Sequence, residues 1–332
     1  MKNATLRQLR VFECVARHLS FSRAAEELHL TQPAISTAVS QLESHAGLAL
    51  FEHLGRRVFL SEAGRTLLIH ARAIMQQVRV AEEALGGLGG ASGGTLNVAV
   101  ISAGDHFFPG LLAAFQRRHP QVSVSLKVNK RDELLRNLVD NVIDMAIMGR
   151  PPKNADLVNL PFAPHPYVIV AHPRHALAGK RHISWRQLAA EQLILRERGS
   201  DNRHTFEEAT AKNPASFASL MEISSNETIK QSVIAGMGVG FLSLHTIEPE
   251  LRLGRLAILD VAGFPVVRHW HVVHHRQKQL PPVAQAFTAF LLAEGAALIE
   301  QLVSVPGTEK ARAPRKKTAK SPSQHPKKAG AL

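Results

Sequence analysis

A glycine-rich segment divides the chain into two parts with different sequence patterns. Residues 86–94 (Gly-Gly-Leu-Gly-Gly-Ala-Ser-Gly-Gly) hold six glycines in nine positions. Because each glycine disfavours a helix by about 1 kcal/mol relative to alanine, we predict that this segment is a hinge outside any helix. Apolar residues before it recur at helical spacing, whereas short apolar runs after it alternate with helical stretches. The pattern predicts a small all-α domain followed by a larger α/β part.

Residues 1–60 have the pattern of a helix-turn-helix. Apolar spacing predicts a helix over 5–19, a second that Ser22 caps and a third that Thr31 caps, with Pro33 tolerated in its first turn. The outward polar residues of the third helix are Gln32, Ser36, Thr37 and Ser40. Glutamine can bond adenine at two atoms, and hydroxyls can serve bases or phosphates, so this face suits DNA reading. An ordinary three-helix domain with a polar surface fits the same pattern.

A hairpin and a long helix follow these three helices. Apolar residues at 50–51 and 58–60 predict a β-hairpin wing, whose Arg56 and Arg57 suit phosphate or a minor groove. Residues 61–85 then predict a helix with apolar residues that step by four and three, as in a coiled coil. This seam consists of Leu67, Ala71, Ile74, Val78, Ala81 and Leu85. Such a seam needs a partner helix, so we expect a homodimer.

The motifs of this first part resemble those of LysR-type transcriptional regulators. They are Ser-Phe-Ser-Arg-Ala-Ala-Glu-Glu-Leu at 20–28, Thr-Gln-Pro-Ala-Ile-Ser at 31–36, Gln-Leu-Glu at 41–43, Gly-Leu-Ala-Leu-Phe at 47–51 and Leu-Ser-Glu-Ala-Gly at 60–64. The resemblance implies a winged helix-turn-helix. It places Gln32, Pro33 and Ser36 in the major groove, Ser22 and Thr31 near phosphates, and Arg56 or Arg57 on the wing. Members often carry Arg or Lys where this chain has Thr37 and Ser40.

From residue 95 the pattern predicts a sheet covered by helices. One β/α series runs over 96–148 and a second over 167–244, followed by a strand at 268–274 and a helix at 283–302. Two lobes are implied, 95–163 with 268–303, and 164–267. In such sheets, ligands bind at the carboxyl ends of the strands. At these ends the N-termini of helices offer N–H groups to anions. The polar residues of these loops are Ser102, Lys130, Arg131, Gly149, Arg150, Ser200, Arg203, Ser225 and Asn226. Each alone fits a helix cap or a surface position; several at the same kind of loop favour a ligand site.

This second part resembles the LysR effector domain, a two-lobed fold similar to periplasmic solute-binding proteins, with chain crossings near 162–166 and 265–269. Within the family, the likeness is closest to activators of the Calvin-cycle (RuBisCO) operon, and it covers roughly residues 1–303. Ala-Ile-Met-Gly-Arg-Pro-Pro at 146–152 and the segments 224–231 and 240–246 carry it. It implies a non-covalent anionic effector, a phosphorylated metabolite or NADPH, with Arg150 and Arg203 as anion ligands. An acid beside such a pocket, as at Asp201, is unfavourable unless it is paired.

The resemblance also implies partners: promoter DNA, the metabolite, RNA polymerase and further copies of the chain in a dimer or tetramer. Regulation of another pathway is an alternative within the family. A solute-binding protein or an α/β enzyme with an accessory DNA-binding domain is the alternative from another class. A signal peptide and catalytic motifs are missing from the pattern, so we expect neither of these.

The charge of the chain is concentrated at one end. The net charge is +13, and residues 306–332 hold eight Lys or Arg against one Glu. We expect residues 304–332 to form a disordered tail, which either keeps the protein soluble or contacts nucleic acid without sequence preference.

The remaining signals favour a soluble cytoplasmic protein without metal or membrane. The single cysteine, Cys14, excludes an intramolecular disulfide and is typical of a reducing compartment; we expect it to be a small core residue. His269, His271 and His275 share a face of a predicted strand, but no carboxylate or cysteine accompanies them, so a metal site is disfavoured.

Overall fold

The computed structural model describes residues 1, 3–55, 57–88, 93–153, 156–211, 217 and 219–303. Arg56, the tail at 304–332 and the middle of the predicted hinge lie outside these residues. The N-terminal domain consists of α1 (Leu6–His18), α2 (Phe21–Leu28), α3 (Gln32–Ala46), β1 (Phe51–Leu54) and β2 (Arg57–Leu60). The helix-turn-helix and its hairpin wing are confirmed.

Side chains of the chain itself begin these helices. Thr5 and Gln8 form a reciprocal cap at α1, and the Thr31 hydroxyl accepts a hydrogen bond from the N–H of Ala34 at α3, as predicted. The prediction for α2 is wrong by two residues, because Ser20 and not Ser22 supplies its cap. The inner faces of the three helices then meet around Phe12.

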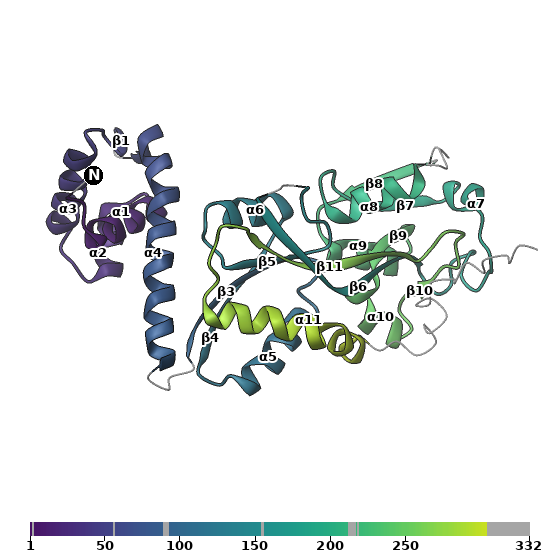
Figure 1. Cartoon of the computed structure of the whole chain (residues 1–332). Helices are drawn as coiled ribbons and strands as arrows, with labels where there is room; N and C mark the ends of the chain where they lie inside the picture. Colours follow the sequence, from purple (N-terminus) through teal and green to yellow (C-terminus); the bar gives the residue numbers. More distant parts are fainter. Residues whose placement is uncertain are drawn as a thin grey trace, which may run out of the picture.

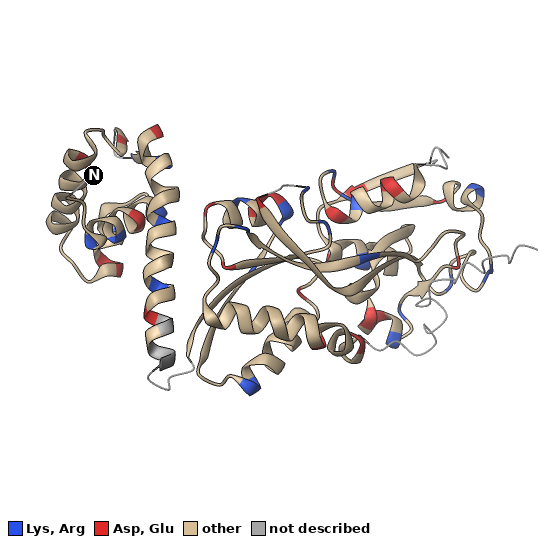
Figure 2. Cartoon of the chain, viewed as in Figure 1, with Lys and Arg blue, Asp and Glu red and all other residues tan. Residues whose placement is uncertain are grey.

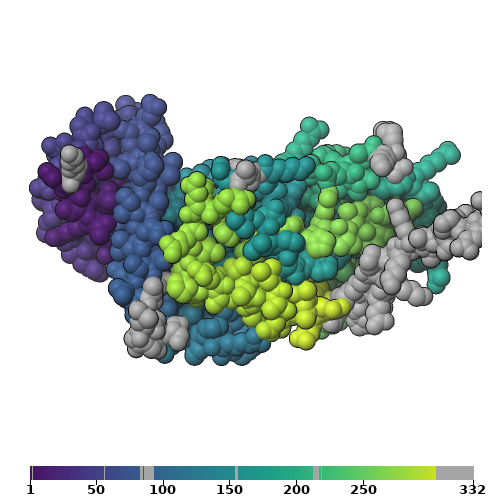
Figure 3. All heavy atoms as spheres, in the orientation of Figure 1, coloured from purple at the N-terminus to yellow at the C-terminus, as the bar shows by residue number. Residues whose placement is uncertain are grey.

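Helix α4 (Glu62–Leu88) joins the two parts of the chain and extends further than predicted. It includes Gly86 and Gly87, so the proposed hinge does not begin at its first glycine. Once a long helix has formed, each further residue at its end adds a hydrogen bond without the cost of a new nucleus. This gain offsets the modest helix-propensity cost of each glycine. The model places α4 between the N-terminal helices and the α/β part (Figures 1 and 3).

The α/β part has the two predicted lobes. Lobe 1 contains β3 (Gly94–Ile101), α5 (Phe108–Arg118), β4 (Val122–Asn129), α6 (Arg131–Val139), β5 (Met145–Met148) and α11 (Pro282–Leu302). Lobe 2 contains α7 (Trp185–Ala189), β7 (Gln192–Arg196), α8 (Asp201–Thr210), β8 (Ser219–Ile223), α9 (Asn226–Ile234), β9 (Val239–Ser243), η1 (Leu244–Thr246), α10 (Glu248–Arg252) and β10 (Ala257–Ile258). One core fills lobe 1, and two cores cover the two faces of the lobe 2 sheet.

Two long strands, β6 (Leu157–Ala171) and β11 (Val266–His275), carry the chain between the lobes. They pair antiparallel over their shared length and join both lobes in one nine-stranded sheet, in the order β4-β3-β5-β11-β6-β9-β7-β8 with β10 beside β6. The pairing shifts by one residue between Trp270 and His271, which leaves Phe162 as an extra residue of β6. The predicted crossings near 162–166 and 265–269 are therefore parts of β6 and β11.

Helix α11 is the one described helix that is long and apolar enough to cross a membrane by length and composition. It packs on β6, β3 and α5, and Phe287 and Leu291 are fully buried in the lobe 1 core. The apolar surface of α11 therefore packs against other elements of lobe 1.

Asp144, just before β5, fastens α4 to lobe 1. Its side chain is fully buried and accepts hydrogen bonds from Arg79 of α4 at 2.5 Å and from the N–H of Asn97 at 2.8 Å. The ammonium of Lys278 lies 3.3 Å away. Burial lowers the pKa of Lys278 to about 8, and the charge of Asp144 opposes this shift. One carboxylate thus balances two cations of different segments.

Candidate functional site

Helix α3 presents the predicted polar face to solvent. Gln32, Pro33, Ser36, Thr37 and Ser40 are exposed, as are Ser22 and Thr31, whereas Ile35, Val39 and Leu42 are buried on the opposite side. The hydroxyl of Ser22 donates a hydrogen bond to the amide oxygen of Gln32 at 3.2 Å, which orients that amide from α2. The helix carries no lysine or arginine (Figure 2). This face therefore presents neutral donors and acceptors, which can read base edges.

The wing is a two-stranded hairpin, and His53 of β1 stacks on Phe21 of α2. Its strands pair from Phe51 with Leu60 to Leu54 with Arg57, and Gly55 turns the chain with a φ of +60°. Arg57 is exposed, as a phosphate contact requires. Arg56, its predicted companion, is outside the described residues.

The predicted seam of α4 divides into two parts. Ala71 is fully buried in the core of the N-terminal domain, and Leu67 is half-buried against it. Further along, Ile74 is 40% exposed and Leu85 is 68% exposed, Ala81 is exposed and Val78 is half-buried. The first part of the predicted seam therefore packs within the chain, because the short helices α1–α3 need α4 to close their own core.

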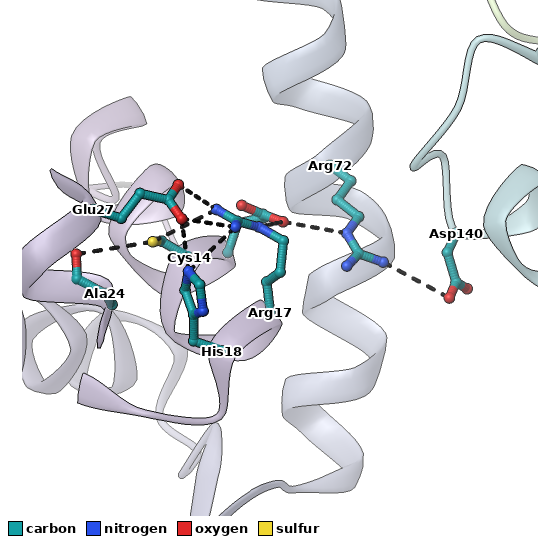
Figure 4. A network of polar contacts seen from close by, with 8 residues as sticks. Cys14, Arg17, His18, Ala24, Glu27, Arg72 and Asp140 are labelled. Carbon is teal, nitrogen blue, oxygen red and sulfur yellow. Dashed lines mark hydrogen bonds and ion pairs between the residues drawn. The ribbon is translucent and has the colours of Figure 1, made fainter. Parts of the chain in front are cut away.

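A network of polar side chains links the N-terminal helices to lobe 1 through α4 (Figure 4). Arg72 of α4 lies 3.6 Å from Glu13 of α1 and 3.7 Å from Asp140 at the end of α6. This bridge gives the two domains a direct electrostatic contact.

The same network surrounds the single cysteine. Cys14 is buried, as predicted, and its ligand atom lies within 4.8 Å of those of His18 and Glu27. However, the guanidinium of Arg17 donates to both oxygens of Glu27, and this bond with that of His18 lowers the pKa of Glu27 to about 2. Burial raises the pKa of Cys14. Because Arg17 fills the place of a cation, we assign this group as an ion-pair network.

A cavity of about 160 Å³, the effector cavity below, lies between the two lobes. Three helices begin at its wall: α6 behind Lys130, α8 behind Ser200, and α9 at Asn226. The free N–H groups of helix N-termini favour anions. The polar wall and the converging helices therefore suit a small anionic ligand.

Arg196, the last residue of β7, is the central cation of this cavity. It is 6% exposed and donates hydrogen bonds to Asn226 at 2.7 Å and to Ser102 of lobe 1 at 3.5 Å. Glu197 receives its other N–H groups at 2.7 and 2.9 Å. The guanidinium thus lies where both lobes meet, already oriented by three partners.

Asp132, Glu197 and Asp201 are the acidic residues of this lining, and Asp201 is paired with arginines. Asp201 is buried, with Arg131 at 3.0 Å and Arg150 at 3.6 Å, and it accepts the backbone N–H of Arg150 at 3.1 Å. Burial raises the pKa of Asp201, and the two arginines oppose this. Its charge is therefore directed at arginines of lobe 1.

Family models match most of the chain. The model for the bacterial regulatory helix-turn-helix protein, lysR family, matches residues 6–65, and the LysR substrate binding domain matches residues 89–296. The chain belongs to the LysR family. It is accordingly a DNA-binding transcriptional regulator and not an enzyme.

Named relatives of this LysR-family regulator extend over nearly its whole length. The RuBisCO operon transcriptional regulator of Allochromatium vinosum is 47% identical over 294 residues, 89% of this chain and 97% of that protein. The regulatory domain of CcmR from Synechocystis PCC6803, solved in complex with 2-PG, is 36% identical with a TM-score of 0.57, over 61% of this chain and 97% of that one. A full-length variant of OxyR from Pseudomonas aeruginosa shares the fold, with 24% identity and a TM-score of 0.71 over 89% of this chain and 94% of that one.

The structure brings five of the nine predicted effector residues of this LysR-family chain together. Those that line the effector cavity are Ser102, Lys130, Arg131, Ser200 and Asn226. Gly149, Arg150, Arg203 and Ser225 are not part of its lining. Arg203 instead contacts Glu207 at 2.7 Å, and Ser225 caps α9. Gly149 packs so closely on His165 that a Cβ would lie 2.9 Å from its ring.

Sequence reasoning missed the central arginine of the LysR-family cavity. Arg196 is the last residue of β7, whereas the candidates from sequence come from the loops that follow the strands. The signal was present, because a charged residue at the carboxyl end of a buried strand faces the ligand side of an open α/β sheet. Asn129 and Ser243, also in the lining, are likewise the last residues of strands, whereas Tyr167 lies inside β6 and carries no comparable signal.

Proposed function

We propose that this regulator controls transcription of a RuBisCO operon and activates it when a small anionic metabolite occupies the effector cavity. The proposal of an anionic metabolite rests on one observation: the N-termini of three helices and Arg196 meet between the lobes. The name of the Allochromatium relative supports the operon. The protein acts in the cytoplasm as a dimer or tetramer, joined partly through the exposed half of α4, and contacts RNA polymerase at the promoter.

The size of the cavity favours one kind of effector. Pockets for drug-sized ligands measure roughly 300 to 1,000 Å³, and this cavity has about 160 Å³. A compact phosphorylated acid or sugar suits that volume better than NADPH. The CcmR domain solved with 2-PG supports the same class.

A binding experiment tests this function. Purified full-length protein is titrated onto the promoter region of the RuBisCO operon and onto an unrelated promoter, with sugar phosphates, phosphorylated acids and NADPH added in turn. We expect preferential binding to the first promoter and a change of footprint with a small phosphorylated compound. Equal affinity for both promoters would refute the operon assignment, and a response to NADPH alone would refute the effector class.

Gln32 is expected to specify the operator sequence. Gln32→Ala removes an amide that Ser22 holds at the exposed face of α3, so binding to the operator should weaken by about 1 to 3 kcal/mol, with little change on random DNA. Fluorescence anisotropy with both DNAs measures this. Gln121→Ala, an exposed glutamine of lobe 1, is the matched control. An equal loss on both DNAs would reassign Gln32 to a phosphate contact.

A further inference from the structure

A second cavity lies beside the effector cavity, on the other side of Asp201. It measures about 660 Å³, and the loop after β5, helix α8 and strand β11 form its walls. We call it the hinge cavity, because β11 is one of the two strands that connect the lobes. Its cations are Arg131, Arg150, Lys153 and Arg268.

The carboxylates near the hinge cavity balance only part of this charge. Asp201 is shared by Arg131 and Arg150. Glu208 of α8 pairs with Arg268. Four cations thus face two carboxylates among the described residues, and the excess positive charge lies in a concave site, where attraction for anions is strongest.

Imidazoles add donors to the same walls. His204, His269 and His271 line the cavity. The Nδ1 atom of His271 is buried and has no hydrogen-bond partner in the part of the chain that the structure describes. Burial, with the charges of Arg150 and Arg268, lowers the pKa of His204. These features are those of a site in which the positive charge is only partly balanced by carboxylates.

We propose that the hinge cavity is a second anion site, which takes a ligand with two or more phosphate or carboxylate charges. The cations are spread over α6, the β5–β6 loop and β11, so a ligand with anionic groups at two positions reaches more of them than a single phosphate does. Among the described residues, the lining holds no Phe, Tyr or Trp, so the recognised part of the ligand is its charge and not an aromatic base. The site shares Arg131 with the effector cavity and does not depend on which operon is regulated.

Calorimetry with inorganic pyrophosphate on the full-length protein tests this site. We expect Lys153→Gln/Arg268→Gln to weaken pyrophosphate binding by at least about tenfold, since two charged contacts are removed. Lys180→Gln/Arg186→Gln removes the same charge from exposed positions near α7 and should leave the affinity unchanged. Lys153→Gln alone, at an exposed side chain, should give a smaller loss and keeps the test valid if the double variant is unstable.

Three results would overturn the proposal. They are no pyrophosphate binding by the wild-type protein, an equal loss in both double variants, and a loss with Arg196→Gln that the hinge variants do not show. The last would place pyrophosphate in the effector cavity. Operator binding without ligand, measured on the same samples, reports separately on the proposed regulatory function.

Discussion

Replacing Asp144 with asparagine is expected to lower the free energy of unfolding of the effector domain by about 3 to 5 kcal/mol, because removal of one partner leaves buried charges uncompensated. Asp144 is fully buried, and Arg79 and Lys278 both depend on it. At roughly 2 to 4 °C per kcal/mol, the unfolding midpoint should fall by about 6 to 20 °C. Differential scanning calorimetry measures the change.

Asp140→Asn is the matched control for this experiment. Asp140 also pairs with an arginine of α4, but its side chain is 46% exposed and its distance to Arg72 is 3.7 Å. Exposed pairs contribute about 0 to 1 kcal/mol, so its midpoint should change little. Similar losses in the two variants would show that burial does not determine the strength of the α4 contact.

Arg196→Gln is expected to weaken binding of the effector by about ten- to a hundredfold, with operator binding of the ligand-free protein unchanged. A hydrogen bond to a charged group contributes about 1.5 to 3 kcal/mol, and Arg196 is the buried cation at the junction of both lobes. Isothermal titration with the metabolite that changes the footprint measures the loss.

Arg203→Gln distinguishes the structural assignment from the one based on sequence. Arg203 is also buried, but it faces Glu207 and Glu222, so its replacement should leave effector affinity near the wild-type value. If Arg203→Gln abolished binding while Arg196→Gln did not, the anion would lie elsewhere in lobe 2.

The fold could be predicted from sequence where local patterns decide it. Thr31 was predicted to cap α3, and the apolar residues of this segment lie on one side only if it is helical. Both features are present in the structure. The end of α4 could not be predicted this way, because glycine propensity is a small local term that a long preceding helix outweighs.

The effector site was less predictable, because an arginine near the end of a strand can bind a ligand or pair with a carboxylate of the same chain. Arg203 and Glu207 are spaced at i and i+4, which on a helix brings opposite charges together, so this pairing was readable from the sequence. The separation of Arg150 from the effector cavity was not. It depends on Asp201 of the other lobe, 51 positions away, and no local pattern reports such a contact.

The connection between the lobes determines how far they can rotate. Because β6 and β11 remain paired through the crossing, a relative rotation must be taken up as torsion of a two-stranded ribbon. Such a ribbon resists twisting along its hydrogen-bonded length, except where the extra residue at Phe162 interrupts the ladder and increases the local twist. The ribbon is therefore stiff to torsion along its paired length and easier to twist at Phe162. A rotation of one lobe against the other would therefore be concentrated at Phe162, and the paired residues on either side would oppose it.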